Sequence, residues 1–167
     1  MAILNPDHLL EQAEKLIAPP PHGPPRQVDI RRAISAAYYS VFHATLAANE
    51  YVGAAHKWAN RYTLAYRSID HQKVREVCAK AKLAHVPREI SLYAPSDGFD
   101  PEIRDLASAL HELQQKRHDA DYNPSIRVRT SDARLAISAA RRALDRLQAA
   151  NSASREAFLG LLLFKVR

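Results

Sequence analysis

Residues 28–49, VDIRRAISAAYYSVFHATLAAN, decide the fold class of this 167-residue chain. Apolar side chains such as Ile30, Ile34 and Ala37 recur there every three or four positions, which is the period of one face of an α-helix. Asp29 suits the positive N-terminal end of such a helix. The many alanines allow a neighbouring helix to approach closely. We therefore expect a long helix here that packs against other helices.

The rest of the chain is also rich in helix-forming residues, contains only four glycines and shows no strand or hairpin pattern. Residues 19–25, PPPHGPP, form a stiff connector, because proline removes backbone donors and restricts the residue before it. The helical pattern dissolves into a loop over residues 84–99. Asp100 and Thr130 are expected to cap the helices that follow them. The expected helices span residues 5–17, 28–49, 54–69, 70–82, 100–122, 130–150 and 152–164.

These patterns predict an all-α fold, an antiparallel bundle of about five to seven helices in one domain covering residues 1–167.

The net charge of +6 and the isoelectric point near 9.6 favour anionic partners such as nucleic acid, nucleotides or an acidic protein, although many basic proteins bind none. Cys78 is the only cysteine, so no disulfide can form within the chain, which fits a reducing compartment. Without a signal peptide or an apolar run of about 20 residues, we expect a cytoplasmic protein with no membrane association.

The apolar stripe of residues 100–122 ends in polar side chains. At the spacing of its leucines, the next positions hold Arg117 and, four residues later, Asp121, so these two side chains can pair on one face. Tyr122 follows directly. Burying such a pair costs several kcal/mol unless its partners are good. Either a satisfied network fixes the helix register, or Arg117 clamps a phosphate or another anion.

The helix of residues 28–49 carries a matching polar face. Arg31, Ser35 and Tyr38/Tyr39 lie at three- and four-residue steps along one side of it, and Tyr39 and His43 lie along the next. Antiparallel packing of the two helices would bring both polar sets together.

Two of these segments resemble the HEPN family (higher eukaryotes and prokaryotes nucleotide-binding helical domain). Residues 29–43, DIRRAISAAYYSVFH, resemble its early core helix, and residues 113–122, LQQKRHDADY, resemble its later arginine-bearing helix. The resemblance covers about residues 28–150 and leaves the apolar C-terminal helix, residues 152–164, outside it. It implies an antiparallel helical bundle that commonly dimerises and a link to RNA or nucleotides. A place in a toxin–antitoxin or defence system, with a protein partner from a neighbouring gene, is a hypothesis.

Catalytic members of this family are metal-independent ribonucleases with an Arg-x4-6-His motif. Their histidine carries a proton near pH 7, and their arginine stabilises charge on the phosphate. In this chain Tyr122 occupies the place of that histidine, and a tyrosine, with a pKa near 10, is a poor base. His118, which points about 100° away from Arg117 around the helix, and His43 are the other candidates for the proton carrier.

The leading hypothesis is a HEPN-like homodimer that binds RNA or a nucleotide. In this hypothesis Arg117 is the anion clamp and Asp121 orients it, while the rest of the pocket consists of Tyr122, Arg31, Ser35 and Tyr39. One alternative is a metal-independent endoribonuclease that uses Arg117 with His118 or His43. The other is a purely structural bundle whose partner is a protein.

No metal or cofactor is expected. The chain has no His-x3-His, HExxH or Cys/His ligand spacing and no glycine-rich phosphate loop. Pairs such as Arg67 and His71 are expected to lie on solvated faces.

Overall fold

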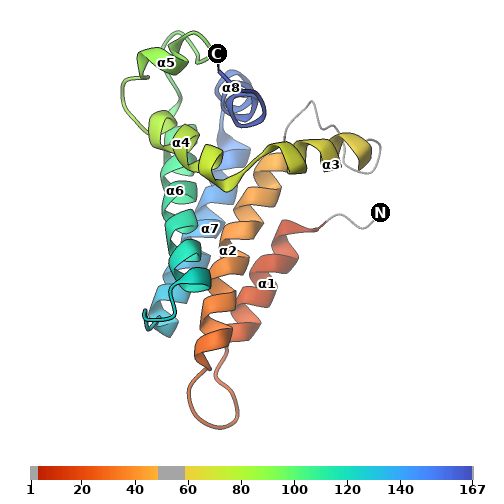
Figure 1. The fold of residues 1–167 in the computed structure, drawn as a ribbon, viewed down its shortest axis with the longest axis vertical. Helices are drawn as coiled ribbons and strands as arrows, with labels where there is room; N and C mark the ends of the chain where they lie inside the picture. Colours follow the sequence, from red (N-terminus) through yellow and green to blue (C-terminus); the bar gives the residue numbers. More distant parts are fainter. Residues whose placement is uncertain (1–3, 49–58, 167) are drawn as a thin grey trace.

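The computed structural model describes residues 4–48 and 59–166, and all regular secondary structure in these residues is helical. The helices are α1 (Pro6–Ile17), α2 (Gln27–Ala47), α3 (Ala59–Ser68), α4 (His71–Ala81), α5 (Arg88–Ser91), α6 (Pro101–Tyr122), α7 (Thr130–Ala149) and α8 (Ser152–Leu163). The body of the bundle consists of α1, α2, α6 and α7, which run side by side, while α4, α5 and α8 gather at one end (Figure 1). The predicted all-α bundle is confirmed, with eight helices in the described residues.

Helix α2 is the centre of this bundle and packs against α1, α6 and α7. Its small side chains Ala33, Ala37 and Ser40 are fully buried, which lets the neighbouring helices approach closely. Among the described residues, Tyr38 is the largest fully buried side chain. The helix that decided the fold class in the sequence is therefore also the helix on which the others assemble.

Polar caps set the starts of several helices. Asp100 caps α6, as predicted, and its Oδ1 accepts a hydrogen bond from the Ile103 N–H (2.8 Å). Asn151 caps α8 and accepts from the Ser154 N–H (2.8 Å). The two caps are joined, because the Asp100 N–H donates to Ser154 Oγ (3.0 Å) and the Asn151 N–H donates to Asp100 Oδ2 (2.8 Å). The first turns of α6 and α8 are thereby fixed to each other.

Two expectations about the elements were wrong. Residues 84–99 contain the short helix α5, which Pro87 precedes at the N-cap position. A helix of four residues is too short to show an apolar period, so the sequence pattern could not indicate it. Arg129, not Thr130, is the N-cap of α7, because the Asp132 carboxylate accepts from the Arg129 N–H (2.8 Å) and so begins the helix one residue earlier. The first part of the expected third helix, residues 54–58, lies outside the described residues.

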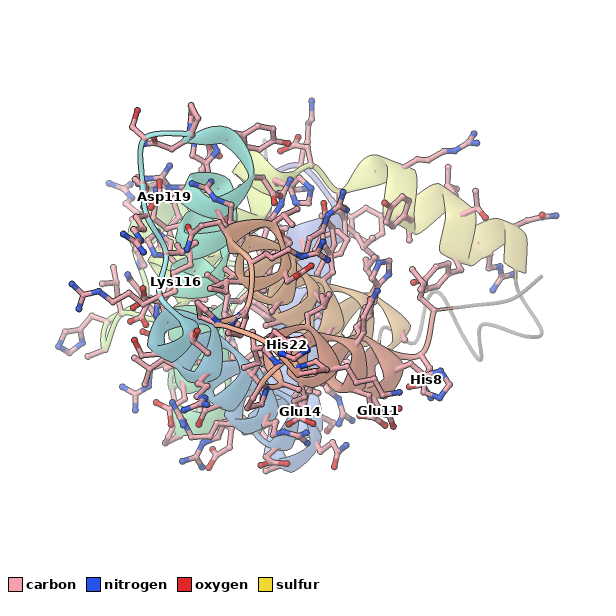
Figure 2. The ribbon with its side chains drawn as sticks, turned by 90° about the horizontal axis from the view of Figure 1, so that it is seen from below. His8, Glu11, Glu14, His22, Lys116 and Asp119 are labelled. Atoms are coloured by element: carbon pink, nitrogen blue, oxygen red, sulfur yellow. The ribbon has the colours of Figure 1, made fainter. Side chains whose placement is uncertain are left out.

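Helix α3 extends away from the body of the bundle (Figures 1 and 2). Two tyrosines attach it to α2 through His43. Tyr62 Oη lies 2.9 Å from His43 Nδ1, and the Tyr66 ring stacks on the His43 ring with centroids 5.7 Å apart. His43 therefore anchors α3.

The apolar helix α8 contributes to the core, since Phe158, Leu159, Leu161 and Leu162 are all buried. Cys78 on α4 is also fully buried. None of the helices in the described residues is both long enough and apolar enough to cross a membrane.

Candidate functional site

The antiparallel packing of α2 against α6 brings the two predicted polar sets together. Ser35 Oγ on α2 donates a hydrogen bond to Asp121 on α6, and the Tyr38 and Tyr39 rings on α2 pack against Arg117. These residues, with Tyr122, form one cluster, which we call the Arg117 cluster.

Arg117 is held on several sides within this cluster and is only 6% exposed. Its Nε donates to Asp121 Oδ2 (3.1 Å), and its Nη2 donates to Tyr122 Oη (3.3 Å). Its Cζ lies 5.4 Å from the ring centroid of Tyr38, 5.2 Å from that of Tyr39 and 5.8 Å from that of Tyr122. Cations are attracted to aromatic rings at such distances. The guanidinium is thus fixed in position by one ion pair and three rings.

The donors of Arg117 are only partly used. A guanidinium carries five N–H donors, but Nη1 of Arg117 makes no hydrogen bond to any residue in the described ranges. Nη1 is not fully buried, so it reaches solvent. The Tyr39 hydroxyl likewise reaches solvent without a hydrogen bond to the described residues. The cluster therefore offers fixed donors to a ligand from outside.

Asp121 compensates the charge of Arg117 but does not lie in the core as expected. Its side chain is 30% exposed, and Ala120 takes the buried position before it. One residue turns the helix by about 100°, so Asp121 faces the edge of the α2–α6 contact. There its carboxylate accepts from both Arg117 and Ser35.

Arg31 lies next to this cluster but has a different environment. Its Nη1 donates to the carbonyl oxygens of Ala120 (2.7 Å) and Asn123 (3.0 Å), and its Nη2 donates to that of Ile126. These carbonyls belong to the end of α6 and the loop after it, where backbone acceptors lack partners within the helix. The contacts favour a structural role for Arg31, whose expected role as a pocket residue stays a prediction.

Tyr122 lies at the surface of the cluster, with 64% of its area exposed. Its ring centroid is 5.2 Å from that of His118, which is also exposed. The cluster lies between two surface hollows. One is lined by residues that include Arg31, Asp121, Tyr122 and Ile126. The other lies between α1 and α2 and is lined by residues that include Leu9, Leu16, Ser35 and Tyr39.

The two candidate histidines have separate positions. His118 reaches the cluster only through Tyr122. His43 is buried, its Nδ1 is bonded to Tyr62, and burial lowers its pKa below the ordinary value. The arrangement therefore brings neither imidazole into direct contact with Arg117.

His71, expected on a solvated face, is instead part of the cluster. Its Nδ1 lies 2.8 Å from Tyr38 Oη, and its ring centroid lies 5.5 Å from that of Tyr38 and 6.0 Å from that of Tyr39. Burial lowers the pKa of His71, the positive charge of Arg117 lowers it further, and Asp70 opposes the shift. No local pattern could indicate this contact, because α4 and α2 are far apart in sequence.

Metal-ligating side chains form no cluster in the part of the chain that the structure describes. His8, Glu11 and Glu14 follow α1, away from Lys116 and Asp119 on α6 (Figure 2). Within residues 4–48 and 59–166, no three His, Cys, Asp or Glu side chains come close enough to hold a metal ion.

No family model, curated protein or solved structure matches this chain. The HEPN resemblance therefore rests on the two quoted segments, residues 29–43 and 113–122.

Proposed function

We propose that this protein binds RNA or a nucleotide, with the phosphate at Arg117. The observation that carries the proposal is the state of the guanidinium, which is buried and fixed although Nη1 has no acceptor in the described part of the chain. Nη1 can therefore donate to an acceptor that arrives from solvent, and arginine forms strong, directed hydrogen bonds to phosphate oxygens.

The exposed ring of Tyr122 gives this site a second means of recognition. Its hydroxyl is bonded to Arg117, so the exposed ring is held next to the arginine. Aromatic side chains beside a cation bind single-stranded nucleic acid by stacking on the bases while the cation contacts the backbone. The net charge of +6 supports attraction to such a polyanion.

The proposal includes a homodimer, which the HEPN resemblance implies, and a protein partner from a neighbouring gene, as in a toxin–antitoxin or defence system. The hollow between α1 and α2 supports an interface, since it is apolar at Leu9, Leu16 and the half-exposed Val28 and reaches Tyr39. Light scattering of the purified protein measures the mass in solution. A monomer at every concentration would remove the homodimer from the proposal without affecting Arg117.

Binding of a fluorescently labelled single-stranded RNA, followed by anisotropy, tests the central proposal. Arg117→Met keeps an unbranched side chain between the tyrosine rings and removes the donors. We expect RNA binding at least about tenfold weaker, since a hydrogen bond to a charged group contributes about 1.5–3 kcal/mol. Binding by the wild type should also weaken as salt increases.

Arg88→Met is the matched control. It removes the same charge from an exposed position on α5, at the end of the bundle where α6 begins (Figure 1). Equal affinities for the two variants, with both folded by circular dichroism, would contradict a phosphate site at Arg117.

One observation supports endoribonuclease activity as a second candidate function. Tyr122 contacts both Arg117 and His118, so a phosphate at Arg117 would lie near an exposed imidazole. Incubation with total RNA in EDTA tests this activity. Cleavage that is lost in both Arg117→Met and His118→Gln would support it, whereas intact RNA with a folded wild type would leave binding as the proposed function.

A further inference from the structure

His71 and Arg117 share their aromatic surroundings although they come from different helices. The Arg117 Cζ and the His71 ring lie within 6.0 Å of the ring centroids of both Tyr38 and Tyr39. The positive charge of Arg117 also acts on His71, since it lowers the pKa of the imidazole. The two side chains therefore belong to one site.

The contact with Tyr38 decides which nitrogen of His71 carries the proton. Tyr38 is fully buried, and burial raises its pKa, so its hydroxyl stays protonated. Among the described residues, the acceptor within reach of this hydroxyl is His71 Nδ1, at 2.8 Å. A buried O–H needs an acceptor, so Tyr38 donates and Nδ1 accepts. The proton of the neutral imidazole is then on Nε2.

The Nε2 atom of His71 is available to a ligand. It makes no hydrogen bond to the residues that the structure describes, and it is not a fully buried atom. The backbone of His71 is fixed as well, because Gln114 Nε2 on α6 donates to its carbonyl oxygen. The imidazole thus presents an N–H donor on the same tyrosine pair as Nη1 of Arg117, which has no acceptor among the described residues.

We propose that His71 is the second phosphate-binding side chain of the Arg117 site, where it donates from Nε2 to a phosphate oxygen of the bound RNA or nucleotide. This inference rests on the proposed function. It assigns His71 the role of a neutral donor and not of a general base, because Nδ1, the unprotonated nitrogen, is occupied by Tyr38. The charged side chains that act on it are Arg117 and Asp70, and these oppose each other.

Two substitutions separate this role from a merely structural one. His71→Asn places an amide oxygen near the position of Nδ1, so the Tyr38 hydroxyl keeps an acceptor while the Nε2 donor is lost. His71→Gln reaches the position of Nε2 with an amide N–H but leaves Tyr38 without its acceptor. We expect His71→Asn to bind the labelled single-stranded RNA about tenfold more weakly than the wild type and His71→Gln to lose much less. A structural role predicts the reverse order, with the greater loss in His71→Gln.

Nuclear magnetic resonance of protein labelled with ¹⁵N in its histidines gives a direct readout. The His71 signals are assigned by their loss in His71→Asn. In the free protein they should show Nε2 protonated and Nδ1 unprotonated, and inorganic phosphate should shift Nε2 more than Nδ1.

The outcomes for His71 and for the proposed function are distinguishable. If Arg117→Met loses RNA binding while His71→Asn binds like the wild type, the phosphate site stands and the role of His71 is overturned. A free protein with Nδ1 protonated would also overturn it. If wild-type RNA binding does not depend on Arg117, the proposed function fails and the role of His71 fails with it.

Discussion

Arg31 and Arg117 occupy adjacent parts of the α2–α6 contact, yet their surroundings differ in kind. Arg31 donates three hydrogen bonds to backbone carbonyls at the end of α6 and in the loop that follows. Arg117 is more deeply buried, but its Nη1 has no acceptor among the described residues. The depth to which an arginine is buried therefore says little about its function. The use of its N–H donors is what separates a structural arginine from a candidate binding one.

The loop after α6 supports the structural reading of the Arg31 region. Gln27, one turn before Arg31 on α2, bonds to Val128 through both ends of its amide, since Nε2 donates to the carbonyl oxygen (2.7 Å) and Oε1 accepts from the N–H (3.2 Å). Two side chains of α2 thus fix the backbone that leads from α6 to α7. The Arg117 cluster contacts side chains instead, and it leaves donors open to solvent.

The largest effect that separates the two regions is expected in stability. Arg31→Met leaves partly buried carbonyls at the end of α6 without donors, and we expect the free energy of unfolding to fall by about 2–3 kcal/mol. Urea denaturation measures the loss. Arg26→Met, at the exposed N-cap arginine of α2 that pairs with Asp29, is the control and should leave stability unchanged. Equal stabilities for the two variants would remove the structural role from Arg31.

A smaller effect is expected in RNA binding at the surface of the Arg117 cluster. Tyr122→Ala removes a ring that is mostly exposed, so folding should be unaffected, while single-stranded RNA should bind about tenfold more weakly because base stacking is lost. Tyr122→Phe keeps the ring and should bind close to the wild type. Fluorescence anisotropy compares them with Tyr93→Ala, which removes an exposed tyrosine near α5. If Tyr122→Ala and Tyr93→Ala bind alike, the ring is not part of the site.

The smallest expected effect is a dependence of stability on pH that belongs to the Arg117 side. The native state lowers the pKa of His71, so the unfolded chain binds more protons once the pH falls through the ordinary histidine value of about 6.5. Stability should therefore be highest above that pH and decline as the pH falls towards the lowered native pKa. Urea denaturation at several pH values should show a smaller decline in His71→Asn than in the wild type.

The stability of Arg31→Met should decline with falling pH as that of the wild type does, because the substitution leaves His71 and its neighbours in place. An unchanged pH dependence in His71→Asn would show that burial of this imidazole does not contribute to the loss of stability at low pH. His43 has a lowered pKa as well, so part of the decline should remain in that variant.

Much of the fold could be predicted from local patterns. The apolar period of α2 and the capping residue Asp100 before α6 gave those two helices almost at their observed bounds. The spacing of Arg117 and Asp121 predicted their ion pair, because residues four apart lie on one face of a helix. These features depend on residues that are close in sequence.

The remaining features depend on contacts between distant segments. Nothing local to His71 indicates that α4 brings it to Tyr38, and nothing local to Arg31 indicates that carbonyls some 90 residues later accept its donors. The exposure of Asp121 also depends on how α6 is rotated against α2, since a turn of one residue exchanges it with Ala120. Sequence spacing gave Arg117, Asp121 and Tyr122 as members of the candidate site, but neither His71 nor the use of the donors.

The most direct test measures unfolding free energy and RNA affinity side by side for Arg31→Met and Arg117→Met. The account predicts opposite results. Arg31→Met should lose stability and, when folded, still bind the labelled single-stranded RNA. Arg117→Met leaves the partly exposed Asp121 paired with Ser35, so it should lose less stability than Arg31→Met but bind at least about tenfold more weakly. A stability loss in Arg117→Met as large as that in Arg31→Met, with RNA affinity unchanged, would contradict the account and make both arginines structural.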